Sequence, residues 1–247
     1  MQQREEVFTK LATVYDPELD QSLTELGFIN EVIVKGSDVM VSFRLPTYWC
    51  SPNFAFIMAE DIRDRVSELP WVRNVVVCLE DHCASTEINE GVSNGKSFTE
   101  TFPDVSSGEL DELRKTFRVK AFLSRQERLL RHLIRLGFTH VDILNLTIKN
   151  LCDLPNLESE GMLLTKRYLS IRQELGHDNE PQSTAFIQPD GKNLDPESFS
   201  DYLANARRTR LSMEFNGHHC RGLFQTRYSI EQLSELEVCK HESSAFA

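Results

Sequence analysis

The chain has 247 residues, 40% of them apolar, which is enough to bury a core as one large domain or as two of ordinary size. Its 27 Lys and Arg against 38 Asp and Glu give a net charge of −11, and this balance argues against non-specific nucleic-acid binding. The start MQQREEVFTK is polar, and no apolar run approaches the roughly 18 residues that a bilayer span needs, so we expect a cytoplasmic protein with no membrane partner.

The first 83 residues carry the pattern of one small domain. Apolar residues at helical spacing are followed by two runs rich in Val, Ile and Phe, a second helical segment and a third apolar run. Ser51 and Pro52 suit the N-cap and the first position of the second helix. The expected elements are a helix at 3–13, a hairpin at 28–45, a helix from 52 to Pro70 and a strand at 71–80. This α-β-β-α-β order predicts a two-layer α+β domain at residues 1–83.

The rest of the chain divides into a linker and a larger region. Gly, Ser, Thr and Pro content indicates a linker at 84–107, and we expect a client-recognition or scaffold domain at 108–247. The expected elements there are a helix ending at Gly137, a helix at 158–175, a strand at 184–188, a helix at 195–207 and a hairpin at 211–228 that turns at Asn216 and Gly217. The predicted fold class is therefore α+β, with a small N-terminal domain followed by a mainly helical C-terminal region that ends in a β-hairpin.

Cys50 lies in the segment LPTYWCSP, immediately before the predicted N-cap of the second helix. Unpaired backbone N–H groups and the positive end of the helix dipole stabilise a thiolate there, which can bind a soft metal or attack an electrophile. Packing gives a second interpretation, since a free cysteine is a small and commonly buried residue. The six cysteines include no Cys-x-x-Cys pair, and in a reducing compartment we expect free thiols or metal ligands.

The motif DHC at 81–83 holds further candidate ligands at the end of the third predicted strand. Imidazole and thiolate suit iron and zinc. If this strand lies beside the hairpin, its end approaches Asp16 and Cys50 and gives a mixed O/N/S site. In the alternative interpretation, His82 caps a helix that starts near Ala84 and Cys83 is packed.

One segment reverses the charge balance of the chain. Residues 114–150 hold nine Lys or Arg against two acids, whereas residues 1–83 hold seven basic against fourteen acidic side chains. Steps of four, seven, three and seven place five arginines on one stripe of a helix, opposite its leucines. The stripe either docks an acidic client or the acidic first domain, or it is a solvated face. Its members are Arg114, Arg118, Arg125, Arg128 and Arg135.

The segments VYDPELDQSLTELGFI (14–29) and PTYWCSP (46–52) occur together within the α-β-β-α-β order. They resemble the DPEL…LGLV and PTYSGCP motifs of the small iron-sulfur cluster assembly domain family, which includes the PaaD-like and SufT-like metal-sulfur cluster biosynthesis factors. The resemblance covers residues 3–83. It implies a non-catalytic maturation factor that loads an iron-sulfur cluster or iron into a client metalloenzyme. By position in the motifs, Cys50 is the key residue, and the other members are Asp16, Glu18 and Thr47.

The resemblance also implies a transient cargo. Cys50 would bind the cluster or iron, with zinc as an alternative ion, helped by Asp16 or Glu18 and by the neighbouring His82 and Cys83. One thiolate is too few for a stable cluster, so a client or the second Cys50 of a homodimer supplies the remaining ligands. Some relatives accompany bacterial multicomponent oxygenases, and by analogy with them the client would be a diiron oxygenase.

The loop departs from the family pattern at Trp49, where the family has Ser-Gly, and we expect the indole to narrow access to the thiol. Two further functional hypotheses stay open. One is an enzyme that uses Cys50 as a nucleophile with His82 as its general base. The other is a metal-free assembly adaptor or chaperone, for which Cys50 is replaceable and the basic helix is indispensable.

Overall fold

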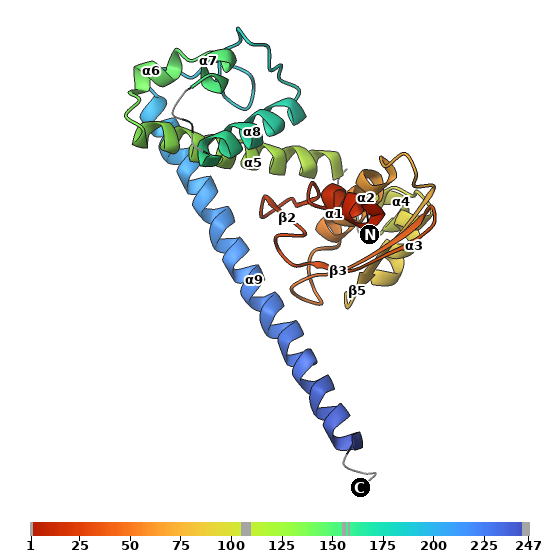
Figure 1. The fold of residues 1–247 in the computed structure, drawn as a ribbon. Coiled ribbons are helices and arrows are strands. Elements are labelled where there is room, and N and C mark those ends of the chain that lie inside the picture. The colour runs from red at the N-terminus through yellow and green to blue at the C-terminus, as the bar shows by residue number, and fades with distance from the viewer. Residues whose placement is uncertain (1, 105–109, 155–156, 158, 244–247) are drawn as a thin grey trace. The chain divides into compact units, whose positions relative to one another are not determined.

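The structure, a computed structural model, describes residues 2–104, 110–154, 157 and 159–243, with side chains as far as Ser229 (Figure 1). The chain forms two compact units. The first unit consists of Met1–Leu110 together with Phe215–Ala247, and the second unit is Asp111–Glu214. In sequence, the second unit is therefore inserted between the two parts of the first.

A three-stranded sheet with the order β3-β4-β5 forms the centre of the first unit. The predicted hairpin is present as β3 (Ile29–Lys35) and β4 (Asp38–Arg44), which are antiparallel. The predicted third strand is β5 (Asn74–Glu80), and it pairs in parallel with β4. Parallel neighbours need a crossover connection, which α2 (Pro52–Ser67) supplies. The carboxyl ends of β4 and β5 consequently lie side by side, and the loops that follow them start at the same edge of the sheet.

The core of the first unit lies between this sheet and its helices. Alternate residues of β4 point to one face of the sheet, so that Val39, Val41 and Phe43 are all buried. The predicted first helix is α1 (Gln2–Leu11), and it buries Val7 and Leu11 in the same core. The apolar face of α2 supplies the largest helical contribution, which comes from Ala55, Phe56, Met58, Ala59, Ile62 and Val66.

The segment predicted as a linker at 84–107 is not a linker in its described part. It forms α3 (Ser85–Ser93) and α4 (Phe98–Thr101), and their apolar side chains Ile88, Val92 and Phe98 are buried in the core of the first unit. Ser97, one of the residues that suggested a linker, caps α4 instead, because its hydroxyl accepts a hydrogen bond from the backbone N–H of Glu100. Residues 105–107 of the predicted linker lie outside the described residues.

The second unit is helical. Its helices are α5 (Leu110–Arg135), α6 (His140–Leu144), α7 (Ile148–Cys152), α8 (Ser159–Glu174) and the first part of α9 (Phe199–Ser243). The helix predicted to end at Gly137 is α5, and the helix expected at 158–175 is α8. They enclose a second core that includes Phe122, Leu129, Leu130, Leu133, Tyr168, Ile171, Phe186 and Phe199.

Two kinds of buried polar contact hold this second core. The Gln126 amide donates to the Ile187 carbonyl at 2.8 Å and to the Tyr168 hydroxyl at 3.0 Å, and it accepts from the Tyr202 hydroxyl at 2.5 Å. The Arg210 guanidinium donates to Glu127 and Glu214, each at 2.5 Å. Arg210 and Glu127 are both buried, so their charges compensate each other inside the unit.

Two predictions for the C-terminal region are wrong. The segment 184–188 forms isolated bridges rather than a strand, with Thr184 facing Thr147 and Ile187 facing Asn193. The hairpin predicted at 211–228 is helical, because α9 runs without interruption through Asn216 and Gly217 (Figure 1). An Asn-Gly pair favours a turn only locally, and the helix is compatible with it because Gly217 packs where a side chain would meet Gln21.

The class prediction is confirmed at the level of α+β, with an α/β region first and mainly helical structure after it. None of the helices in the described part of the chain combines the length and apolar character needed to cross a membrane.

Candidate functional site

The DPEL segment forms a tight turn between two short strands, β1 (Tyr15–Asp16) and β2 (Gln21–Ser22). The Asp16 carboxylate oxygen Oδ1 accepts hydrogen bonds from the backbone N–H groups of Glu18 at 2.9 Å and Leu19 at 3.0 Å. Asp16 is only 8% exposed, and burial raises the pKa of its carboxyl from 3.8 to about 7. Asp16 thus shapes the turn and is a buried acid at the same time.

The Cys50 loop connects β4 to α2. The Cys50 thiol and the Thr47 hydroxyl lie 3.3 Å apart, close enough for the hydroxyl to donate to a thiolate. Ser51 occupies the N-cap position of α2 and Pro52 its first turn, as predicted, but the Ser51 side chain makes no capping hydrogen bond. Cys50 is a free, half-buried cysteine beside the N-terminus of a 16-residue helix.

His82 holds the backbone of this loop through a hydrogen bond. Its ring is 3% exposed, and its Nε2–H donates to the Cys50 carbonyl oxygen at 2.7 Å. Its Nδ1 accepts from the Ala84 N–H at 3.2 Å, so the ring is the neutral Nε2–H tautomer. Burial lowers the pKa of His82, which favours the same neutral form. Both ring nitrogens are therefore engaged in positioning backbone, one at Cys50 and the other at the start of α3.

The loops that follow β4 and β5 are joined directly. The Cys83 N–H donates to the Tyr48 carbonyl oxygen at 3.0 Å, while the Cys83 side chain is exposed. Trp49 is 77% exposed and lies edge-to-face against Tyr48, with ring centroids 5.0 Å apart. The indole consequently extends into solvent beside the Tyr48 ring.

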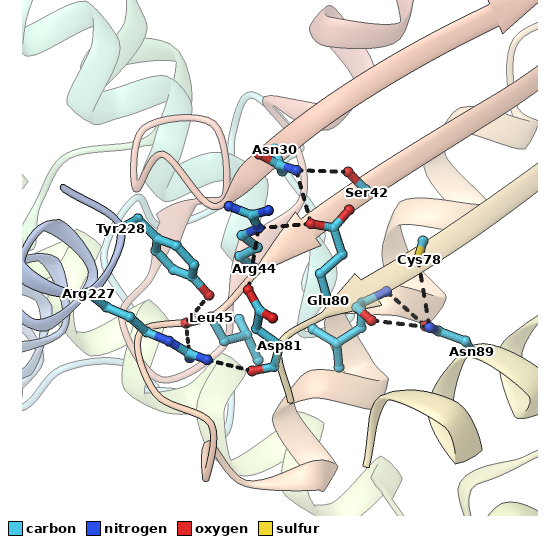
Figure 2. Close-up of polar contacts among 11 residues, drawn as sticks. Asn30, Ser42, Arg44, Leu45, Cys78, Glu80, Asp81, Asn89, Arg227 and Tyr228 are labelled. Atoms are coloured by element: carbon cyan, nitrogen blue, oxygen red, sulfur yellow. Dashed lines mark hydrogen bonds and ion pairs between the residues drawn. The ribbon is translucent and has the colours of Figure 1, made fainter. Parts of the chain in front are cut away.

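The part of α9 that belongs to the first unit contacts the starts of these two loops. The Arg227 guanidinium donates to the Leu45 carbonyl at 3.2 Å and to the Asp81 carbonyl at 2.9 Å, and Arg44 lies over the Tyr228 ring at 5.0 Å (Figure 2). Leu45 immediately precedes the Cys50 loop, and Asp81 immediately precedes His82. Arg44 also pairs with Glu80 at 2.8 Å, across the ends of β4 and β5.

Toward the N-terminal end of α9, the helical turn that precedes Cys220 contacts the DPEL turn. Burial, together with the charges of Asp16, Cys50 and Glu18, raises the pKa of the Cys220 thiol to about 11. The Glu18 carboxylate accepts from the Asn216 amide at 3.4 Å. Cys220 is itself half-buried and packs against the core of the first unit.

The structure places the predicted site residues in two groups. Asp16 and Glu18 lie in the DPEL turn, whereas Thr47, His82 and Cys83 belong to the joined loops around Cys50. Within the described residues, no three or more His, Cys, Asp or Glu side chains are grouped so as to hold a metal ion by themselves.

The predicted arginine stripe does not share one exposed face. Arg118 and Arg135 are exposed, but Arg125 is buried and donates to the Arg167 carbonyl at 3.2 Å. Arg128 is half-buried and pairs with Glu214 at 3.2 Å, and Arg114 is half-buried as well. Spacing along α5 could not reveal this, because the opposite side of the helix is also covered by the second unit's own chain.

Sequence reasoning missed the residues of α9 that contact the first unit, because it read this segment as a hairpin. A signal was present, since residues 217, 220 or 221, 224 and 228 recur at steps of three and four, the spacing of one helical face. The missed residues are Asn216, Arg221, Phe224, Arg227 and Tyr228.

Two features characterise the small α+β domain: the buried acid Asp16 in the DPEL turn, and the Cys50 loop that leads into α2. Residues 4–77 match the family described as iron-sulfur cluster assembly protein. An uncharacterized protein of Methanocaldococcus jannaschii is 35% identical over 89 residues, which make up 35% of this chain and 90% of that protein. Through this segment, the chain belongs to the iron-sulfur cluster assembly protein family, and its general role is in iron-sulfur cluster assembly.

Proposed function

We propose that the protein is an accessory factor that binds iron or an iron-sulfur cluster transiently through Cys50 and delivers it to a client metalloenzyme. The observation that carries this proposal is the contact between the Cys50 thiol and the Thr47 hydroxyl at the N-terminus of α2, inside the segment that matches the family. A hydroxyl donor and the unpaired N–H groups of a helix N-terminus both favour a thiolate, which is the form that binds iron.

The arrangement suits transient better than permanent binding. Cys50 is half-buried and therefore accessible, and the described residues supply no complete ligand set. A client or a second copy of the chain completes the coordination and can then withdraw the cargo. Asp16 and Glu18 offer carboxylates for this exchange, and a diiron oxygenase is a candidate client.

A nucleophilic enzyme fits less well. Such a mechanism needs a general base within hydrogen-bond reach of the thiol. His82 contacts the backbone carbonyl of Cys50 rather than its sulfur, and its other nitrogen accepts from Ala84. We therefore favour a non-enzymatic role over catalysis.

A metal-free adaptor remains the second candidate, because Tyr48 and the 77%-exposed Trp49 beside it form an aromatic surface next to the loop. Exposed aromatic side chains are common contact residues in protein interfaces. An adaptor would bind its client through this surface and would not need the Cys50 thiol.

The test is anaerobic reconstitution with iron and sulfide, followed by visible absorption and metal and sulfide analysis. We expect the wild-type chain to bind iron and the Cys50→Ser variant to lose that binding while its thermal unfolding is unchanged. Cys152→Ser is the matched control, since it removes an exposed cysteine of the second unit. Equal, substoichiometric iron in the wild type and Cys50→Ser would overturn the proposal in favour of the adaptor.

A further inference from the structure

A cavity of about 470 Å³ opens between α5 and the first turns of α9, within the second unit. The α5 residues that line it are Glu127, Arg131 and Ile134, which follow at steps of four and three along one face of the helix. The α9 residues that line it run from Ser200 to Arg208 and also share one face. The volume lies within the range of roughly 300–1,000 Å³ that is usual for pockets that bind small molecules.

One part of the cavity wall is apolar. Ile134 and Leu203 pack against the second core with one side and line the cavity with another. Ala204 lies next to Leu203 in the same wall, and its small side chain leaves space that a larger one would fill. An apolar group that enters this space covers the uncovered sides of Ile134 and Leu203, which is favourable in proportion to the apolar area removed from water.

Another part of the wall carries guanidinium groups from both helices, namely those of Arg131, Arg207 and Arg208. Within the described residues, the side chains of Arg207 and Arg208 take part in no ion pair or hydrogen bond, and both are exposed. Glu127 does not neutralise this group. Its carboxylate already pairs with the buried Arg210 at 2.5 Å, whereas Arg131 is 3.8 Å away, beyond hydrogen-bond distance. The cavity therefore has an uncompensated positive charge.

The charged part and the apolar part lie at different ends of the cavity. The pair of Glu127 and Arg210 places the Glu127 end of α5 at the Arg208 end of the cavity. Ile134, about two helical turns further along α5, lies toward Leu203 at the other end. Exposed arginines are usually only solvated. Here, however, arginines from two helices converge on one hollow that also has an apolar wall, and this combination suits a ligand that has both characters.

We propose that this cavity binds a small organic anion, whose carboxylate, phosphate or sulfate group is held by Arg131, Arg207 and Arg208 and whose apolar body lies against Ile134 and Leu203. Guanidinium groups suit such oxyanions, because their N–H donors can bind two oxygens at once. The proposal does not depend on the proposed function, since every residue that lines the cavity lies in the second unit and outside residues 4–77.

The experiment is isothermal titration calorimetry of the full-length chain with octyl sulfate, an anion that carries an apolar chain. We expect saturable binding that becomes about tenfold weaker in Arg207→Gln, because a hydrogen bond to a charged group contributes at least that much. Ala204→Phe should abolish binding without removing a charge, because the ring fills the cavity. Arg118→Gln removes an exposed arginine of α5 that does not line the cavity, and this matched control should bind like the wild type.

Two further probes separate the two parts of the ligand. Octyltrimethylammonium has the apolar chain with the opposite charge, and inorganic sulfate has the negative charge without the chain. Both should bind more weakly than octyl sulfate. If octyltrimethylammonium binds as tightly, the cavity is only an apolar groove, and if inorganic sulfate binds as tightly, it is only a charged patch; either result would overturn the proposal.

The site is also wrong if the wild type does not bind octyl sulfate, or if Arg207→Gln and Ala204→Phe both titrate like the wild type. Thermal unfolding of each variant by circular dichroism shows that lost binding is not lost structure. Iron binding through Cys50 should be unchanged in Arg207→Gln, so a failure of this proposal leaves the proposed function standing.

Discussion

The two units bury polar side chains in different ways. In the second unit, several buried polar side chains contact one another as well as backbone: Gln126 accepts from Tyr202, and Arg210 donates to Glu127. In the first unit, the buried Asp16 and His82 contact the backbone of loops instead. The contacts in the first unit fix the geometry of turns and leave the neighbouring Cys50 thiol accessible, as expected of a functional site. The contacts in the second unit complete the interior of a folded core.

This difference shows that burial of polar groups does not by itself mark a functional site. Gln126 and Tyr168 are as deeply buried as any group near Cys50, yet their hydrogen bonds end on each other and on backbone carbonyls within the core. What distinguishes the first unit is that His82 hydrogen-bonds to the backbone of Cys50, whose thiol is only half-buried. The following predictions probe this distinction.

Removal of Arg210 should have the largest effect. In Arg210→Met, the buried Glu127 keeps its charge but loses the guanidinium 2.5 Å away, and we expect a loss of about 3–5 kcal/mol in the unfolding free energy of the second unit. Urea unfolding followed by circular dichroism measures it. Iron binding through Cys50 should be retained under conditions where the chain is folded, and a loss below about 1 kcal/mol would contradict a structural role for the pair.

The second prediction concerns Asp16 and pH. The folded carboxyl has a pKa near 7 and the unfolded one near 3.8, so between these values folding takes up a proton. The contribution of Asp16 to stability is therefore complete below pH 3.8 and is lost as the pH rises through 7, by up to about 1.4 kcal/mol per pH unit. Asp16→Asn keeps the oxygen that accepts from Glu18 and Leu19 but removes this dependence.

The measurement is the difference in unfolding free energy between wild type and Asp16→Asn at pH 5 and at pH 8, which cancels the other titrating groups. We expect the variant to gain stability relative to the wild type at the higher pH. Asp16→Ala is the control, because it removes the acceptor and should destabilise the turn at both values. A difference that is independent of pH would show that the carboxyl is not held protonated.

The third prediction separates positioning from ligation at His82. His82→Ala leaves the Cys50 carbonyl without its donor and the Ala84 N–H without its acceptor, so we expect a loss of about 1–3 kcal/mol and faster alkylation of Cys50 by iodoacetamide. The wild-type contribution is present above pH 6.5 and is lost as the pH falls through the lowered pKa of the ring.

His82→Gln is the matched variant, because its amide N–H can still donate to the Cys50 carbonyl. It should restore most of the stability and the slow alkylation while removing the imidazole. If His82→Gln loses iron binding as completely as Cys50→Ser does, His82 is a ligand and the positioning role is wrong.

The smallest effect is expected at an exposed ion pair. Lys10 and Glu68 lie 2.7 Å apart in the first unit, but both are solvent-accessible, and Lys10→Met should change the unfolding free energy by at most about 1 kcal/mol. Raising the salt concentration should reduce even this contribution. A change as large as that of Arg210→Met would remove the distinction between exposed and buried pairs.

Local sequence patterns determined most of the first unit. Alternation in β4, the Gly36 turn and the Ser51-Pro52 start of α2 each act over a few residues, so the β-β-α-β order and the place of Cys50 at the strand-to-helix junction were predictable. The juxtaposition of Thr47 and Cys50 follows from the same short loop. The DPEL turn was likewise recognisable, because an Asp that accepts from the N–H groups two and three residues later is a local structure.

Tertiary structure decided the rest. The polar segment after residue 84 folds because Ile88, Val92 and Phe98 find a core to fill, although its composition alone resembled a linker. The Asn-Gly pair of α9 is helical because the packing of the helix around it, from Gly217 against Gln21 to Phe224 against Phe28, outweighs a local turn preference worth about 1 kcal/mol. The contacts of α9 with Glu18, Gln21 and Phe28 depend on that same packing, and no short-range pattern encodes contacts between residues so far apart in sequence.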